Sequence, residues 1–152
     1  MLPVLMSALH VLSLGMGLGA VFARGRALRG LVAGDARALG RVFFADNFWG
    51  LSALLLIATG LTRLFAETDK ALDFYLYNGF FWVKMGLFAL VFALEIAPMT
   101  AFIRWRVALR KGSPIDTRRA ALFVRINDAQ TAIVVLIPFA AAAMARGLWL
   151  LA

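Results

Sequence analysis

The residues best placed to do chemistry in this sequence are three ionisable side chains that lie inside apolar runs. His10 lies in the run 2–22, and Lys84 and Glu95 lie in the run 79–103. A charged group at the centre of a membrane helix costs about 2.5–3.5 kcal/mol, so such residues mark candidate functional sites. Lys84 and Glu95 share one helical face but lie about 16 Å apart along the axis. Each is therefore expected to belong to a different polar cluster.

The first cluster is predicted on the outer side of the membrane. It contains His10 and Lys84, with Arg63 at the end of the second apolar run. Histidine binds metals and transfers protons, so His10 is a candidate metal ligand or proton-transfer group. Lys84 and Arg63 are cations that could hold carboxylates, such as the propionates of a porphyrin. For Arg63 the alternative is an interfacial residue whose guanidinium reaches the headgroups.

The second cluster is predicted near the cytoplasmic border. Its members are Asp46, Asn47, Glu95, Arg125, Asn127 and Asp128. Carboxylates and arginines at a helix border can satisfy one another near water, so a structural role is the first interpretation. The alternative is a proton exit in which Glu95 and Asp46 take part.

The elements that must position these residues are membrane helices. The chain of 152 residues is 63% hydrophobic and only 16% charged, and its mean hydropathy is +0.87. Runs of about 20 apolar residues match the thickness of a bilayer core. The predicted fold is all-α, a single integral membrane four-helix bundle over residues 1–152. The approximate spans are 2–23, 43–65, 79–103 and 127–151.

The arginines predict the orientation of this bundle. Basic residues crowd the first and third connections, whereas the middle connection is mixed in charge. By the positive-inside rule the first and third connections are cytoplasmic, and both termini lie on the outer, periplasmic side. We expect the helices to extend beyond the bilayer on the cytoplasmic side. The net charge of +8 is then explained by basic residues that orient the helices in the membrane. We expect these residues to contact anionic lipid headgroups and not nucleic acid.

The composition also limits the chemistry. The chain has no cysteine and one histidine, so thiolate metal sites and a bis-histidine haem within one chain are excluded. The sequence contains no phosphate loop and no motif of the common hydrolases. A haem b with His10 as its one histidine ligand is compatible with the sequence, with methionine, another group or an open position opposite.

Two stretches resemble a known family. The segments ALHVLSLGMG (8–17) and NGFFWVKMGLFALVFALE (78–95) are similar to the two best-marked helices of the HemJ family. These are small four-helix bacterial membrane proteins that oxidise protoporphyrinogen and carry b-type haem. The resemblance places the family's histidine on His10 and its lysine on Lys84. The chain departs from that pattern at Trp82 and Glu95, where further histidines are expected.

The chain as a whole resembles a family of bacterial inner-membrane proteins with a domain of unknown function. The motifs that carry this resemblance are ALH (8–10), ADNFWG (45–50), ATGLTRL (58–64) and FWVKM (81–85). The resemblance implies a multi-pass protein of the bacterial inner (cytoplasmic) membrane, and it implies no activity.

Three functions follow as hypotheses. The first is a haem- or porphyrin-binding protein acting in redox or tetrapyrrole chemistry, with His10, Lys84 and Glu95 as its catalytic candidates. The second is a non-catalytic accessory or assembly subunit of a larger energy-transducing membrane complex. The third is a small proton-coupled transporter, which would need a homo-oligomer to enclose a path.

Overall fold

The computed structural model describes residues 1–65 and 72–151, and helices dominate this part of the chain. The helices are α1 (Leu2–Val32), α2 (Ala38–Phe65), α3 (Leu72–Leu76), α4 (Gly79–Arg110) and α5 (Ala120–Ala145). Four of them, α1, α2, α4 and α5, are long and apolar enough to cross a membrane. The all-α, four-helix membrane fold predicted from the sequence is therefore confirmed. Residues 66–71 of the middle connection, which is mixed in charge, lie outside the described part.

The long helices exceed the thickness of a bilayer core. α1 has 31 residues and is about 46 Å long, against about 30 Å of hydrocarbon. Compared with the expected spans, α4 continues to Arg110 and α5 begins earlier, at Ala120. α5 also ends earlier than expected, at Ala145, because Gly147 takes a left-handed backbone conformation (φ 70°) that turns the chain.

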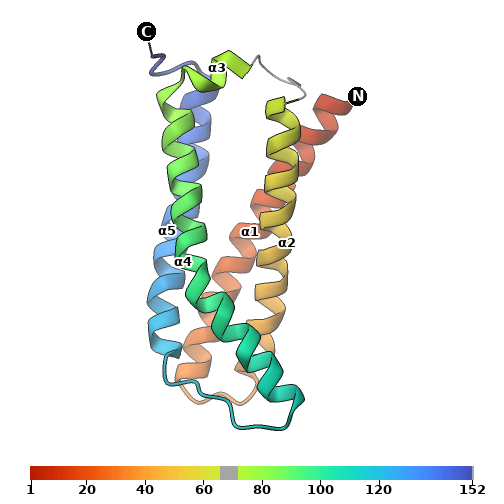
Figure 1. Ribbon diagram of the computed structural model, residues 1–152, viewed down its shortest axis with the longest axis vertical. Helices are drawn as coiled ribbons and strands as arrows, with labels where there is room; N and C mark the ends of the chain where they lie inside the picture. The colour runs from red at the N-terminus through yellow and green to blue at the C-terminus, as the bar shows by residue number, and fades with distance from the viewer. Residues whose placement is uncertain (66–71, 152) are drawn as a thin grey trace.

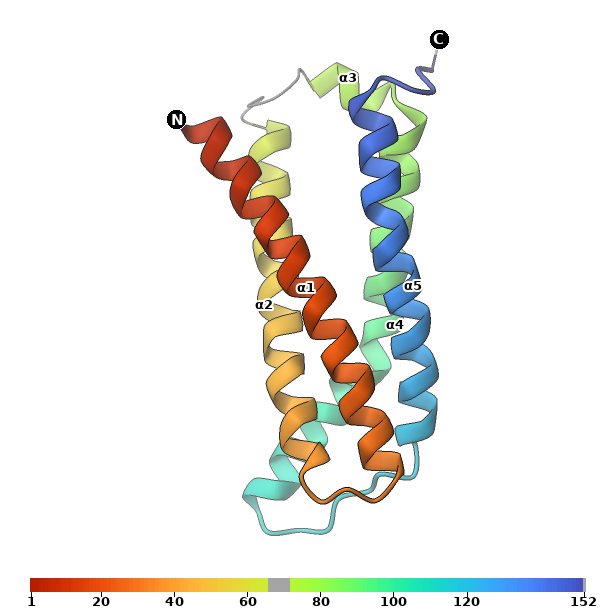
Figure 2. The ribbon, with the colours of Figure 1, turned by 180° about the vertical axis from the view of Figure 1, so that it is seen from behind.

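The four long helices form two pairs, α1 with α2 and α4 with α5 (Figure 1). Both termini and α3 lie at one end of the molecule, here called the terminal end. The connections 33–37 and 111–119 lie at the other end, where most of the arginines are in the adjoining helix ends; it is here called the basic end. The two pairs lie close together at the basic end and diverge toward the terminal end, as both views show (Figure 2).

Apolar packing joins the pairs at the basic end and in the middle of the bundle. The basic-end cluster draws on all four long helices and consists of Ala27, Leu28, Val42, Phe102, Trp105, Ala120 and Phe123. The middle cluster also draws on all four and consists of Ala20, Val21, Trp49, Val91 and Val134. By contrast, no residue of α1 before Ser13 is buried. The bundle is thus held together chiefly over its basic half.

The buried face of α4 passes Pro98 and not Met99 on its way to the basic end. Pro98 cannot donate a backbone hydrogen bond, and proline inside a helix bends it. The sequence places Met99 on the inner face with Lys84 and Glu95, but Met99 is exposed (46%). Beyond Glu95 the buried face instead runs through Pro98, Phe102 and Trp105.

The C-terminal segment folds back over the start of α4. The backbone N–H of Gly79 donates to the carbonyl of Trp149, and the N–H of Leu151 donates to the carbonyl of Tyr77. Asn78 is fully buried; its Oδ1 accepts from Phe80 N–H, and its Nδ2 donates to the Leu148 carbonyl. These bonds fasten the terminal ends of α4 and α5 to each other.

Gly79→Ala tests this attachment. A Cβ at Gly79 would lie 2.7 Å from Cε2 and Cε3 of Trp149, so the indole must move. We expect a loss of about 1–3 kcal/mol of stability, the usual range for overpacking, measured by unfolding in detergent. Gly86→Ala is the matched control on the same helix, because a Cβ there meets nothing within 4 Å. Equal stability of the two variants would contradict the packing described here.

Candidate functional site

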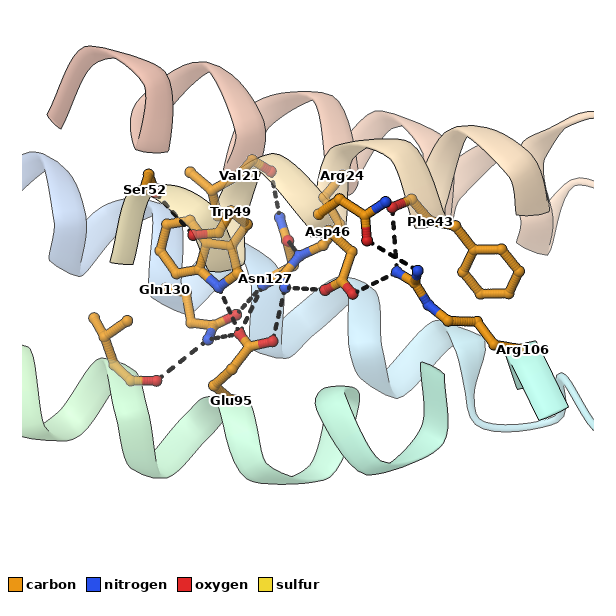
Figure 3. A network of polar contacts seen from close by, with 12 residues as sticks. Val21, Arg24, Phe43, Asp46, Trp49, Ser52, Glu95, Arg106, Asn127 and Gln130 are labelled. Carbon is orange, nitrogen blue, oxygen red and sulfur yellow. Dashed lines mark hydrogen bonds and ion pairs between the residues drawn. The ribbon is translucent and has the colours of Figure 1, made fainter. Parts of the chain in front are cut away.

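Arg24 of α1 lies at the centre of a polar network that reaches all four long helices (Figure 3). Its side chain is fully buried, with 0% exposure. Nε donates to Asn127 Oδ1 at 2.9 Å, and Nη1 donates to Asp46 Oδ1 at 3.1 Å. Nη1 and Nη2 hold the Glu95 carboxylate at 2.8 and 2.9 Å, and Nη2 also donates to Gln130 Oε1 at 2.8 Å. A guanidinium has five N–H donors, so every donor of Arg24 is used.

Glu95 of α4 is bound from three directions. Besides Arg24, its Oε2 accepts from Trp49 Nε1 at 2.9 Å and from Gln130 Nε2 at 2.6 Å. Gln130 Nε2 also donates to the carbonyl of Val91, one turn before Glu95. The carboxylate is therefore fixed by residues of α1, α2 and α5, and a second conformation would break several bonds at once.

Asp46 connects the buried arginine to a second arginine nearer the surface. Its Oδ1 accepts from Arg24, and its Oδ2 accepts from Arg106 at 2.9 Å. Arg106 also donates to Asn47 Oδ1 and to the Phe43 carbonyl, and its guanidinium lies 4.7 Å from the Phe43 ring centroid. Two arginines and two carboxylates make the network neutral in charge, which buried ion networks require.

Local sequence explains why the network can form. Arg24 continues the inner stripe of α1, because Ser13, Gly17 and Val21 lie on the same face and are buried. Gly25 lets α5 approach closely: a Cβ there would lie 2.6 Å from Asn127 Nδ2. Asn127 Nδ2 uses this proximity to donate to the Val21 carbonyl at 3.0 Å.

The second predicted cluster, the one near the cytoplasmic border, is only partly brought together in the structure. Asp46, Glu95 and Asn127 all contact Arg24, and Asn47 joins through Arg106. The two remaining members lie apart from this network and are exposed. Asp128 forms an ion pair with Arg29, and Arg125 lines a surface groove between α1 and α5.

The network also contains residues that the sequence interpretation did not select: Arg24, Trp49, Arg106 and Gln130. Arg24 and Arg106 were taken as topogenic arginines because of their loop-proximal positions. Arg24 could have been identified from its position on the same helical face as Gly17 and Val21. The signal for Arg106 was its spacing of eleven residues from Glu95, which puts both on one face of the helix, whereas Arg104 lies on the opposite face.

His10 lies at the α1–α2 contact in the terminal half. Its Nδ1 lies 2.7 Å from Thr59 Oγ1, and that hydroxyl donates to the Leu55 carbonyl at 2.6 Å. Because the single hydroxyl proton is used on the carbonyl, Thr59 must accept from His10, and Nδ1 carries a proton. In the neutral imidazole the lone pair is then on Nε2.

Lys84 lies half-buried on α4 in the terminal half. Its Nζ is 5.5 Å from the ring centroid of Phe81, one turn earlier on the same helix. Arg63 of α2 lies close enough for its positive charge to act on Lys84. Within the described residues Lys84 forms no ion pair with a carboxylate, which distinguishes it from Arg24.

The described residues contain no group of three or more His, Asp or Glu side chains that could hold a metal ion. A metal at His10 would therefore need most of its ligands from a cofactor. A porphyrin supplies four nitrogen ligands, so the presence of one histidine is compatible with haem and poorly suited to a bare metal ion.

The family of the chain follows from comparison with family models. Residues 2–148 match the family described as "Predicted membrane protein (DUF2214)", a domain of unknown function. The chain belongs to this family of predicted membrane proteins. No curated protein and no solved structure matches it.

Arg24→Met tests the central role of the network. The change leaves Glu95 and Asp46 without their shared partner, and breaking a buried ion pair on one side costs about 3–5 kcal/mol. We expect the free energy of unfolding, measured in detergent, to fall by that amount. Arg26→Met is the control, because Arg26 lies two residues away on the same helix and is exposed. A loss no larger than that of the control would show that Arg24 is dispensable.

Proposed function

We propose that this integral membrane protein binds haem b or a related porphyrin in the terminal half of the bundle. His10 is the residue proposed to bind the iron of the haem. The observation that carries the proposal is the hydrogen bond between His10 Nδ1 and Thr59 Oγ1. Metal-binding histidines commonly donate their other N–H to a neighbouring acceptor, which fixes the tautomer and the ring orientation.

Lys84 supports the same proposal by its charge. A half-buried ammonium in a membrane helix is costly without an anion, and no carboxylate of the described residues pairs with it. A porphyrin propionate would neutralise it. Arg63 is the second candidate for such a contact, because it lies near Lys84 at the same end of the bundle.

Each of the residues would then have a separate role in haem binding. Bound haem would supply one-electron redox chemistry at its iron. His10 would hold the cofactor, Thr59 would fix the ring of His10, and Lys84 would orient the propionate side. Glu95 was also a catalytic candidate, but its bonds to Arg24, Trp49 and Gln130 favour a structural role.

The visible absorption spectrum of the purified protein tests the proposal. We expect a Soret band, and α and β bands after reduction, at about one haem per chain when haem supply is ample. His10→Ala should abolish these bands. Thr59→Val should keep them but weaken haem affinity about tenfold or more, the usual cost of losing such a supporting hydrogen bond.

Thr62→Val is the control for Thr59→Val. Thr62 lies three residues further along α2, and its hydroxyl bonds only to the Ala58 carbonyl. Haem affinity should be unchanged in this variant. A wild-type protein without a Soret band, or a His10→Ala variant that keeps it, would contradict haem binding at His10.

The proposed setting is the bacterial inner membrane, with the basic end in the cytoplasm and both termini in the periplasm. The basic residues in the connections and adjoining helix ends at the basic end support this orientation through the positive-inside rule. The exposed basic residues there would contact anionic headgroups.

Single cysteines test the orientation, because the natural chain has none. Asp73→Cys places a thiol on α3 at the terminal end, and Ser113→Cys places one in the connection at the basic end; both positions are exposed. A maleimide that cannot cross membranes should label Asp73→Cys in spheroplasts and label Ser113→Cys only after the membrane is opened. The reverse pattern would show the opposite orientation.

A proton-coupled transporter is a second candidate function. The observation that favours it is the chain of ionisable side chains from Glu95 through Arg24 and Asp46 to Arg106. Transport would require Arg24 to release Glu95, so Glu95→Gln should abolish pH-dependent uptake into vesicles. A second copy of the chain would be needed to complete the path.

The third candidate function is that of an accessory subunit of a larger membrane complex. The observation that favours it is an apolar groove of about 220 Å³ on the face of α1 and α2, lined by Met16, Gly19, Ala20, Ala23, Phe44, Ala45 and Phe48. Such a surface of small residues beside aromatic rings suits a helix of another subunit. In that case His10→Ala would have little effect on the function of the protein, and the protein would co-purify with its complex.

A further inference from the structure

A second surface groove lies between α1 and α5 at the basic end. It measures about 210 Å³ and is lined by Arg29, Val32, Ala121, Val124 and Arg125. Two arginines from different helices thus face one small, otherwise apolar groove. Neither residue belongs to the buried network of Arg24.

Arg29 is held in a fixed position on one side of the groove. Its Nη2 donates to Asp128 Oδ1 at 2.6 Å. Its guanidinium also lies over Gly25, where an added Cβ would come within 3.3 Å of Nη1. Arg29 is therefore oriented by α1 and α5 together, although half of its side chain is exposed (54%).

Arg125 carries the charge that the protein itself does not neutralise. It lies one turn before Asp128 on α5, yet within the described residues it forms no ion pair, since Asp128 is bound to Arg29. The first turn of α5 has no acidic residue and no side-chain cap, so the helix dipole adds positive potential here. Arg29, Arg125 and Asp128 together carry one net positive charge, which matches a single phosphodiester.

The order of residues along the helix axes matches the order of groups in a phospholipid. Because α1 runs toward the basic end and α5 runs away from it, the two arginines lie nearer the bilayer centre than Val32, Ala121 and Val124. Arg29 follows Arg24 by about 7.5 Å along α1, which places it near headgroup level if Arg24 lies at the border of the hydrocarbon. Acyl chains, phosphate and headgroup alcohol would then follow one another from the hydrocarbon into the groove.

We propose that this groove is a specific binding site for an anionic phospholipid of the leaflet at the basic end. The phosphate lies between Arg29 and Arg125, and a small headgroup alcohol lies against Val32, Ala121 and Val124. The site is independent of haem binding at the terminal end. It differs from the general attraction of anionic lipid to basic residues because it depends on one groove and two named arginines.

Native mass spectrometry of the full chain, released from nanodiscs of phosphatidylcholine with added phosphatidylglycerol, tests the site. We expect one retained phosphatidylglycerol per chain, with about fivefold weaker affinity in Arg125→Gln, the loss typical of one arginine near a lipid surface. Ala121→Trp should weaken retention as well, because it fills the groove and leaves every charge in place. Arg110→Gln removes one exposed charge elsewhere at the same end and should leave retention unchanged.

Two results would overturn the site. Equal losses in Arg125→Gln and Arg110→Gln would mean that phosphatidylglycerol binds the basic end diffusely. Displacement of the retained lipid by millimolar inorganic phosphate, with wild-type stability unchanged, would mean that the groove recognises a free anion and not a lipid. The lipid site is supported if phosphatidylglycerol retention falls in Arg125→Gln and Ala121→Trp but not in Arg110→Gln. It also requires that inorganic phosphate does not displace the retained lipid.

Discussion

A charged group that is fully buried within a membrane protein must find all its partners inside the protein, and Arg24 is that group here. Its five donors are met by Asn127, Asp46, Glu95 and Gln130, which come from the three other long helices. Each helix can satisfy Arg24 only at one depth and one rotation. The network therefore specifies the register of the bundle, where apolar packing between smooth helix faces would tolerate sliding.

This constraint divides the molecule into two halves with different properties. The basic half contains the neutral ion network, the aromatic core around Phe102 and Trp105, and the close approach of all four helices. The terminal half contains His10, which bonds to Thr59, and Lys84, which forms no ion pair with a carboxylate of the described residues. A basic half that fixes the helix positions would support the haem binding proposed for the terminal half. It also explains why Glu95, although it lies within an apolar run, is a weak candidate for chemistry.

The sequence predicted the helices well because their signal is length and hydropathy, which act locally. It also predicted that Lys84 and Glu95 serve different clusters, because helical geometry fixes their separation. It could not predict that Arg24 binds Glu95, since residues far apart in the chain meet only after four helices have packed. After Glu95 the buried face of α4 passes Pro98 and Phe102, a continuation that the helical period allows as readily as one through Met99, so periodicity alone did not choose between them. Arg125 and Asp128 resemble network members in the sequence, but their rotation on α5 turns them outward.

The most direct test of this account is hydrogen exchange of the arginine side chains in the detergent-solubilised protein, followed by nitrogen-15 NMR. Arg24 is identified as the signal lost in Arg24→Lys. Five buried and bonded N–H groups predict separate Nη signals that exchange slowly with water, in contrast to exposed arginines such as Arg26. Slow exchange would establish Arg24 as the fixed centre of the bundle. A single averaged signal that exchanges as fast as that of Arg26 would contradict it, and with it the assignment of the four helices to one register.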